Sequence, residues 1–170
     1  MAAFIALLCF LLILNQSSSL VNASVSETCK AIGFNYDFCV ATLNADPKSA
    51  SADTQGLAII ATNISKANAT STESTISILL KKTKDNKTSE CLNTCSSMYS
   101  DLIDRLNDTI TAITSKRYFD AKIYLSAAVG VGDDCETQFA ELKVKSPLTK
   151  ENDDSQKLSG LALGITSLLG

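Results

Sequence analysis

The chain has 170 residues, of which 45% are hydrophobic and 19% charged, with a formal net charge of −3 at pH 7. This composition is that of a globular protein and excludes an intrinsically disordered chain. Only 7 Gly and 2 Pro are present, which disfavours a turn-rich β-sandwich and favours a helical domain. The chain has no His, the residue most used for acid-base chemistry and for metal binding, and no Trp. The composition therefore argues against an enzyme, and we expect no cofactor and no metal.

The N-terminus predicts a secretion signal. Residues 1–23 carry no charged side chain, and residues 4–14 form an apolar run that is too short to span a bilayer. A polar stretch follows, and Val21 and Ala23 then occupy the −3 and −1 positions of a signal-peptidase site. We predict a signal peptide over residues 1–23, a mature domain over residues 24–170, secretion, and no membrane attachment after cleavage.

The first part of the mature chain, residues 24–46, predicts a short helical hairpin. Cys29 and Cys39 bracket the segment, and a turn signal at residues 33–36 lies between them. The dipeptide Asp46-Pro47 then marks the boundary between this segment and the next helix. Because proline is tolerated at the first position of a helix, we predict that a long helix begins at Pro47.

The remaining residues, 47–170, contain four amphipathic segments joined by short links. A charged stretch ends the first, and the second opens at residues 88–90. A link at residues 115–117 leads into the third, in which Gly130 and Gly132 mark a kink. Pro147 precedes the last segment. We predict an all-α fold in which a disulfide-stapled N-terminal helical hairpin sits on an up-down-up-down four-helix bundle.

Apolar residues recur at three- and four-residue steps in each segment and identify the faces that we expect to be buried. For the first and third segments, the predicted buried residues are Leu57, Ile60, Ala61, Ile64, Ala67, Ile76, Leu79 and Leu80, and Phe119, Ile123, Leu125, Val129 and Phe139. The second segment has the most sustained stripe, from Leu92 to Ile113. The apolar end of the last segment contains Leu158, Leu161, Ala162, Ile165, Leu168 and Leu169.

Five cysteines remain in the predicted mature chain, at positions 29, 39, 91, 95 and 135. An oxidising compartment favours disulfides, and an odd number leaves one thiol free. Cys91 and Cys95 lie four residues apart on one helix face, so spacing alone does not decide which of them reaches Cys135. Glycosylation sequons at Asn63, Asn68, Asn86 and Asn107 fit a secreted glycoprotein, although such triplets also arise by chance in a chain rich in Ser, Thr and Asn.

Several motifs resemble those of the plant invertase and pectin methylesterase inhibitor family. They follow one another over nearly the whole mature chain, at residues 35–40, 45–49, 52–53 and 55–57, at Cys95 with Tyr99, at Cys135-Glu136 with Phe139, and at residues 146–152. The resemblance implies a bridged hairpin on a four-helix bundle. It also implies a monomeric, non-enzymatic cell-wall protein that inhibits a plant invertase or pectin methylesterase through a non-covalent stoichiometric complex.

The family pairs its first two cysteines with each other and its last two likewise. The resemblance therefore implies bridges between Cys29 and Cys39 and between Cys95 and Cys135. The position of Tyr99 favours Cys95 over Cys91, so we predict that Cys91 is a free thiol.

Invertase inhibitors of this family insert a Pro-Lys-Phe motif, between the second and third bundle helices, into the substrate cleft of the target. The resemblance implies target contacts by the corresponding residues Lys116, Arg117, Tyr118 and Phe119, although the proline is absent. A cation could pair with a glycosidase carboxylate while Tyr118 occupies the sugar position. The alternative interpretation is that Phe119 belongs to the core and the two cations form a solvated helix cap.

For esterase targets the family binds with faces of the bundle helices, and Asp101, Asp104 and Asp108 form one acidic stripe on the second segment. Such a stripe is usually a solvent face, and a glycan at Asn107 would lie beside it.

The competing function is a non-inhibitory helical protein that binds wall pectin. It is motivated by a cluster of lysines, Lys81, Lys82, Lys84 and Lys87. Nucleic-acid binding is disfavoured by the acidic balance of the chain and by secretion.

Overall fold

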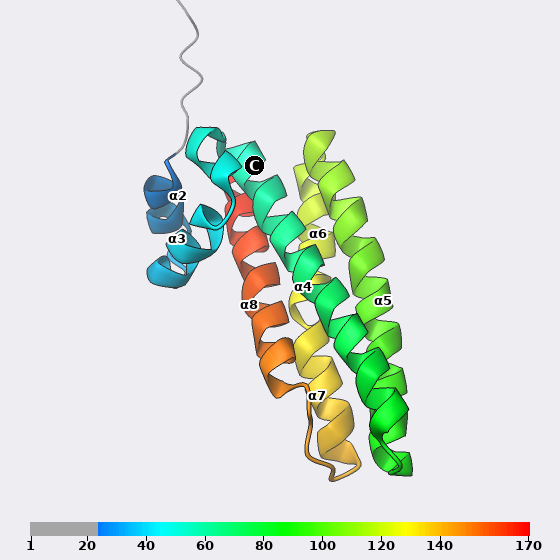
Figure 1. Ribbon diagram of the computed structural model, residues 1–170. Helices are drawn as coiled ribbons and strands as arrows, with labels where there is room; N and C mark the ends of the chain where they lie inside the picture. Colours follow the sequence, from blue (N-terminus) through cyan, green and yellow to red (C-terminus); the bar gives the residue numbers. More distant parts are fainter. Residues whose placement is uncertain (1–23) are drawn as a thin grey trace, which may run out of the picture.

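The computed structural model describes residues 24–170, so the predicted signal peptide lies outside the described residues. The described chain is helical (Figure 1). The hairpin consists of α2 (Val25–Ile32) and α3 (Tyr36–Asn44) and is followed by the short 3-10 helix η1 (Pro47–Ser51). The bundle consists of α4 (Thr54–Lys82), α5 (Asn86–Thr114), α6 (Tyr118–Val129), α7 (Val131–Glu141) and α8 (Thr149–Thr166), with η2 (Ser167–Leu169) at its end. The predicted all-α fold, a stapled hairpin on an up-down-up-down bundle, is confirmed.

Local side-chain chemistry shapes the hairpin. Ser24 and Glu27 form a capping box at the start of α2, and Gly33 ends this helix in the left-handed conformation, with φ 61°. The side chain of Asn35 then caps α3 by accepting a hydrogen bond from the backbone N–H of Phe38 at 3.2 Å. A disulfide between Cys29 and Cys39 joins the two helices, as predicted.

The long helix α4 does not begin at Pro47, so that prediction was wrong. The side chain of Asp46 accepts a hydrogen bond from the Lys48 N–H at 2.9 Å and stabilises the 3-10 helix instead. Ala52 is extended, and Asp53 caps α4 by accepting from the Gly56 N–H at 2.7 Å. The bundle therefore starts about two turns later than the proline signal suggested.

The start of α5 was also misplaced, by two to four residues. Its cap is Asp85, whose carboxylate accepts from the Thr88 hydroxyl at 2.7 Å and from the Thr88 N–H at 2.8 Å. These hydrogen bonds lower the pKa of Asp85 below its ordinary value.

The bundle core follows the predicted stripes except on α6 and at Ala67 and Leu168, which are exposed. Phe119 and Ile123 were predicted to be buried but are 72% and 51% exposed. The buried face of α6 instead presents Ala121, Leu125 and Ala128, because these residues let it pack closely against α5 and α8. The third bundle element breaks at Gly130, between α6 and α7.

The topology gives the bundle two different ends (Figure 1). The hairpin, the α5–α6 connection at residues 115–117 and the C-terminus lie at one end, which we call the hairpin end. The loops at residues 83–85 and 142–148 lie at the other, which we call the distal end. Within residues 24–170, no helix combines the length and the apolar character needed to cross a membrane.

Candidate functional site

The connection between α5 and α6 has a defined backbone. The Arg117 N–H donates to the Ala112 carbonyl at 2.8 Å, and the Lys116 N–H donates to the Ile113 carbonyl at 3.0 Å. Between them Lys116 adopts φ 57°, a position that helix ends usually give to glycine. A lysine there costs about 1 kcal/mol, so the hydrogen bonds hold Lys116 in place against strain.

Two aromatic rings follow and have opposite environments. Phe119 is 72% exposed, whereas Tyr118 is half-buried and its hydroxyl donates to Oε1 of Gln55 on α4 at 3.0 Å. The alternative interpretation of Phe119 as a core residue is therefore wrong. The ring free to meet a partner is that of Phe119, and the ring of Tyr118 ties the connection to α4.

The charges around Phe119 are accessible. Lys116 and Arg117 are both exposed, and Nη1 of Arg117 lies 2.5 Å from Oδ2 of Asp120. An exposed pair of this kind contributes about 0–1 kcal/mol and is readily exchanged for another carboxylate. Phe119 and Ile123 lie one helical turn apart and form a small apolar patch beside these cations.

A shallow acidic hollow lies between α5 and α6. It has a volume of about 240 Å³ and is lined by Asp101, Asp104, Arg105, Asp108 and Tyr124. The three carboxylate residues of the predicted stripe are exposed. Asn107 lies on the other flank of α5, where its Oδ1 accepts from Lys66 of α4 at 3.2 Å.

The four sequons differ in accessibility. Asn63, Asn86 and Asn107 are exposed. Asn68 is half-buried, and its Oδ1 atom is buried without a hydrogen-bond partner in the described chain. A glycan at Asn68 would therefore meet the most crowded surroundings of the four.

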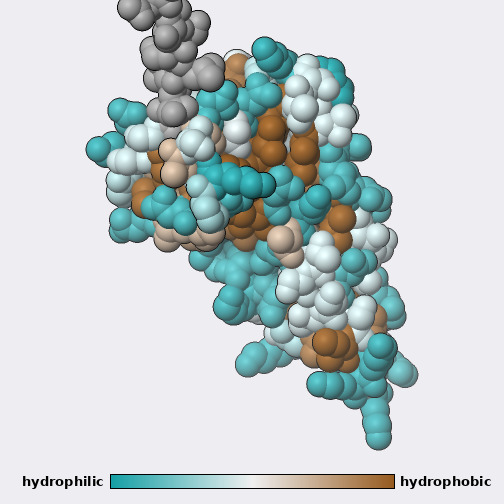
Figure 2. Space-filling view, turned by 45° about the horizontal axis from the view of Figure 1, so that its top comes forward, coloured by the Kyte–Doolittle hydropathy of each residue, from teal (hydrophilic) through white to brown (hydrophobic). Residues whose placement is uncertain are grey.

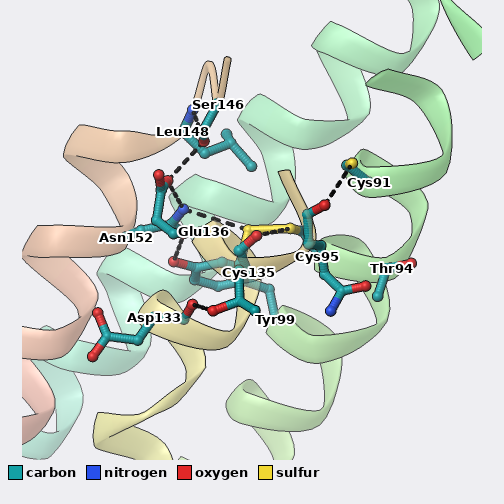
Figure 3. Close-up of a disulfide and its surroundings, with 12 residues drawn as sticks. Cys91, Thr94, Cys95, Tyr99, Asp133, Cys135, Glu136, Ser146, Leu148 and Asn152 are labelled. Carbon is teal, nitrogen blue, oxygen red and sulfur yellow. Dashed lines mark hydrogen bonds between the residues drawn. A yellow bond between two sulfur atoms is a disulfide. The ribbon is translucent and has the colours of Figure 1, made fainter. Parts of the chain in front are cut away.

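The half of the bundle toward the distal end is cross-linked by a second disulfide, between Cys95 of α5 and Cys135 of α7 (Figure 3). Within residues 24–170, Cys91 is the one cysteine outside a disulfide. It is buried, its thiol donates to the Gln138 carbonyl at 3.4 Å, and burial raises its pKa. The structure thus has the cysteine pairing that the family resemblance implied.

A buried polar network surrounds this bridge (Figure 3). The Tyr99 hydroxyl donates to Oδ1 of Asn152 at 2.8 Å, and Nδ2 of Asn152 donates to Oε1 of Glu136 at 2.6 Å. The same carboxylate oxygen accepts from the Ser146 hydroxyl at 2.7 Å, and the Ser146 oxygen accepts from the Leu148 N–H at 3.1 Å. Burial raises the pKa of Tyr99 to about 12, so its hydroxyl remains a donor at physiological pH. The network fixes α5, α7 and α8 and the loop that joins the last two.

The arrangement is suited to binding rather than to chemistry. An exposed aromatic ring with adjacent cations lies at the hairpin end, on a scaffold braced by a disulfide and a polar network. Among residues 24–170, no group of three or more potential ligand side chains is placed to hold a metal ion.

Comparison with known proteins gives a consistent set of relatives. The family model described as plant invertase/pectin methylesterase inhibitor matches residues 23–165. A protein of Platanus orientalis named "Putative invertase inhibitor" is 39% identical over 89% of this chain and 93% of its own length. The "Cell wall / vacuolar inhibitor of fructosidase 2" of Arabidopsis thaliana is 33% identical over 99% of both chains. The crystal structure of a mutant form of a pectin methylesterase inhibitor from Arabidopsis superposes with a TM-score of 0.73, at 26% identity, over 86% of this chain and 97% of that chain.

Of the four residues that the sequence singled out for target contact, Lys116, Arg117 and Phe119 are exposed, whereas Tyr118 is half-buried against α4. The signal for Tyr118 was weak, because its partner Gln55 is 63 positions away. The polar network combines residues of three motifs that carried the family resemblance, Tyr99, Glu136 and Asn152. Their mutual contacts depend on the tertiary fold and could not be read from spacing.

Proposed function

The chain belongs to the plant invertase/pectin methylesterase inhibitor family, and from this membership we propose that it inhibits an invertase by forming a stoichiometric, non-covalent complex. The family consists of inhibitors of enzymes rather than of enzymes, and inhibition is the function supported by the relatives. The specific target and the form of the complex are our proposal.

The observation that carries the proposal is the exposed ring of Phe119 beside Lys116 and Arg117. An aromatic ring that is 72% exposed gains most from burial in a partner's cleft, where it removes apolar area from water. Glycosidases hydrolyse their substrates with a pair of carboxylic residues, which attract a neighbouring cation. Because the backbone at Lys116 is already fixed, little ordering is needed on binding.

A pectin methylesterase is the second candidate target. The specific observation in its favour is the hollow lined by Asp101, Asp104 and Asp108, which offers a docking surface on the bundle helices. Asn107 lies on the flank toward α4, so a glycan there would extend beside this surface rather than fill the hollow. Enzymatic deglycosylation should strengthen esterase inhibition if the glycan hinders docking, and an unchanged inhibition constant would remove this argument.

The test is inhibition of an acid invertase and of a pectin methylesterase by the purified protein between roughly pH 4.5 and 7, compared with Phe119→Ala and Ile123→Ala. We expect submicromolar inhibition of the invertase, a loss of about tenfold or more for Phe119→Ala and a smaller loss for Ile123→Ala. If the protein inhibits the esterase and this inhibition is unaffected by both substitutions, the target is the esterase and the acidic hollow is its docking surface. Inhibition of neither enzyme by disulfide-intact protein would refute the proposal for both targets.

The cellular setting is part of the same proposal. The relative from Arabidopsis thaliana carries "Cell wall / vacuolar" in its name, and residues 1–23 have the composition of a signal peptide. We place the mature chain, residues 24–170, outside the cell as a monomer with glycans at exposed sequons. N-terminal sequencing and mass spectrometry of protein secreted by plant cells will test the cleavage site at Ser24 and the sequon use.

A further inference from the structure

The distal end of the bundle concentrates positive charge from two remote parts of the chain. Lys81, Lys82, Lys84 and Lys87 surround the α4–α5 loop, and Lys143 and Lys145 lie in the α7–α8 loop. All six side chains are exposed. The two loops are adjacent, since Nζ of Lys87 donates to the Leu142 carbonyl at 3.5 Å. The chain as a whole has a net charge of −3, so this end opposes the overall balance.

These lysines form no ion pair among residues 24–170, and Lys87 has the nearby carboxylate of Asp85 as a neighbouring opposite charge. The ion pairs of the described residues are Arg117–Asp120, Lys150–Asp154 and Lys157–Asp153, and none includes one of the six lysines. The acidic side chains within and beside these segments are those of Asp85, Glu90 and Glu141, all exposed. The carboxylate of Asp85 is engaged by Thr88 as the cap of α5. Six lysines against three carboxylates leave the distal end with an excess of positive charge, which attracts a multivalent anion.

The backbone presents part of this cluster rigidly. Lys143 has φ 55°, and the flanking hydrogen bonds run from its own N–H to Ala140 at 3.1 Å and from Val144 to Phe139 at 2.9 Å. A hollow of about 250 Å³ lies among the same segments and is lined by Leu79, Lys82, Thr83, Thr88, Leu92 and Pro147. Figure 2 shows hydrophilic side chains projecting around a small hydrophobic patch at the tip farthest from the hairpin.

We propose that this lysine-rich distal end binds a linear polysaccharide that carries ionised carboxylates, such as de-esterified pectin, and so retains the protein on the cell wall. Ammonium groups are point charges that suit separate carboxylates along a polymer, and the apolar hollow suits the face of a sugar ring. Arginine, which recognises phosphate in a bidentate manner, is absent from both loops, and so is any aromatic ring on which a base could stack. The choice of a wall polymer among polyanions rests on the proposed function, because it requires secretion.

The proposed polymer site is separate from the proposed inhibitory site. Lys116 and Phe119 lie at the hairpin end, so the two surfaces occupy opposite ends of the long axis of the bundle (Figure 1). The protein could therefore hold wall polymer and target enzyme together, as a tether and an inhibitor in one chain.

The experiment uses the full chain produced in a secreting host and deglycosylated, because a glycan at Asn86 would stand between Lys84 and Lys87. Binding to polygalacturonate, to fully methyl-esterified pectin and to anionic phospholipid vesicles is measured at about 50 mM and 500 mM NaCl. The variant Lys84→Gln/Lys145→Gln removes one charge from each loop. The matched control Lys30→Gln/Lys48→Gln removes two exposed charges near the hairpin.

We expect the protein to bind polygalacturonate at low salt and to lose at least tenfold in affinity at high salt. The distal variant should bind about fivefold more weakly than the wild type, whereas the control should change by less than twofold. Equal loss in both variants, equal binding to methyl-esterified pectin, or a preference for vesicles would each overturn the proposal.

Complex formation with the target enzyme, measured without pectin, separates this inference from the proposed function. The distal variant should form the complex as the wild type does. Polymer binding that depends on the distal lysines, found in a protein that inhibits neither enzyme, would uphold the polymer site and refute the proposed inhibition.

Discussion

The two ends of the bundle are held together by different means. Toward the distal end, α5, α7 and α8 are joined by the Cys95–Cys135 bridge and by the network of Tyr99, Asn152 and Glu136. At the hairpin end, the bridge of the hairpin is internal to α2 and α3 and does not reach the bundle. There the hairpin meets α8 through apolar side chains, with Phe34 and Ile32 close to Gly160 and Gly164.

This difference indicates that the distal half of the bundle contributes most of the stability and the hairpin end contributes less. The polar network and its bridge determine one arrangement of the long helices, because buried hydrogen bonds lose much of their energy when misaligned. The exposed residues Lys116, in the connection at residues 115–117, and Phe119, on the first turn of α6, lie at the opposite end of α5 from the distal loops. We therefore expect substitutions near the network to affect stability most and substitutions at the hairpin end to affect it least.

Removing the two bridges separately should give the largest effects. In a Cys91→Ala background, which prevents thiol exchange, Cys95→Ala/Cys135→Ala opens a loop with a sequence separation of 40, and Cys29→Ala/Cys39→Ala opens one of 10. The chain-entropy model assigns about 3.9 kcal/mol to the first bridge and about 2.8 kcal/mol to the second. Urea unfolding measures the loss of unfolding free energy in each variant. A greater loss from removing the hairpin bridge would contradict the view that the distal bridge stabilises the fold more.

The pairing itself is tested on the wild-type protein, in which Cys91 and Cys95 both compete for Cys135. We expect peptide mapping of the unreduced wild type to find Cys95 linked to Cys135 and Cys91 as a free thiol. A peptide in which Cys91 is linked to Cys135 would contradict this pairing.

Gly132→Ala should be nearly as damaging as loss of the longer bridge. A Cβ atom at this position would lie 2.3 Å from the Asn152 carbonyl oxygen and 2.9 Å from its carbonyl carbon. Because these are backbone atoms, α7 and α8 would have to separate, at a cost of about 3 kcal/mol. Gly130→Ala is the matched control, since its nearest neighbours would lie at 3.8 and 4.0 Å. Similar unfolding midpoints for the two variants would show that the α7–α8 contact is not tight.

Tyr99 should make stability fall at alkaline pH. Its pKa in the folded protein is about 12, above its ordinary value of 10, so folding favours the neutral hydroxyl. The resulting stability is complete below pH 10 and is lost as the pH rises through 12, by about 3 kcal/mol in all. Tyr99→Phe lacks this ionisation but leaves Oδ1 of Asn152 without its donor, at a cost of about 1–3 kcal/mol below pH 10.

The two proteins should therefore converge between pH 10 and pH 12. All other titrating groups are common to both, so the difference between their free energies of unfolding isolates Tyr99. If the free energies of unfolding of the two proteins changed with pH in parallel over this range, the Tyr99 hydroxyl would be accessible to water.

The sequence predicted the architecture better than its details, for a physical reason. Helical periodicity records burial averaged over many turns, so the four bundle elements and the hairpin were found. The start of a helix depends on a single capping residue. The sequence pointed to Pro47 and Thr88 as helix starts, whereas the caps in the structure are Asp53 and Asp85. On α6 the apolar pattern favoured Phe119 and Ile123, because large residues weigh more in such a pattern than Ala121 and Ala128, which are the residues buried. Contacts such as Tyr99 with Asn152, or the approach of Lys87 to Leu142, exist only once the chain has folded.

Gly160→Ala should have the smallest effect and the opposite sign. Gly160 lies within α8, where it faces the hairpin, and a Cβ atom there would lie 3.9 Å from the ring of Phe34, which is ordinary van der Waals contact. Alanine is favoured over glycine inside a helix by about 0.8–1.0 kcal/mol, so the variant should be stabilised by nearly that amount, and thermal unfolding should shift upward by a few degrees. A loss of stability would mean that the hairpin is docked on α8 as tightly as α7 is at Gly132. In that case the hairpin end is as constrained as the distal half of the bundle, and the difference between the two ends does not lie in how tightly their helices pack.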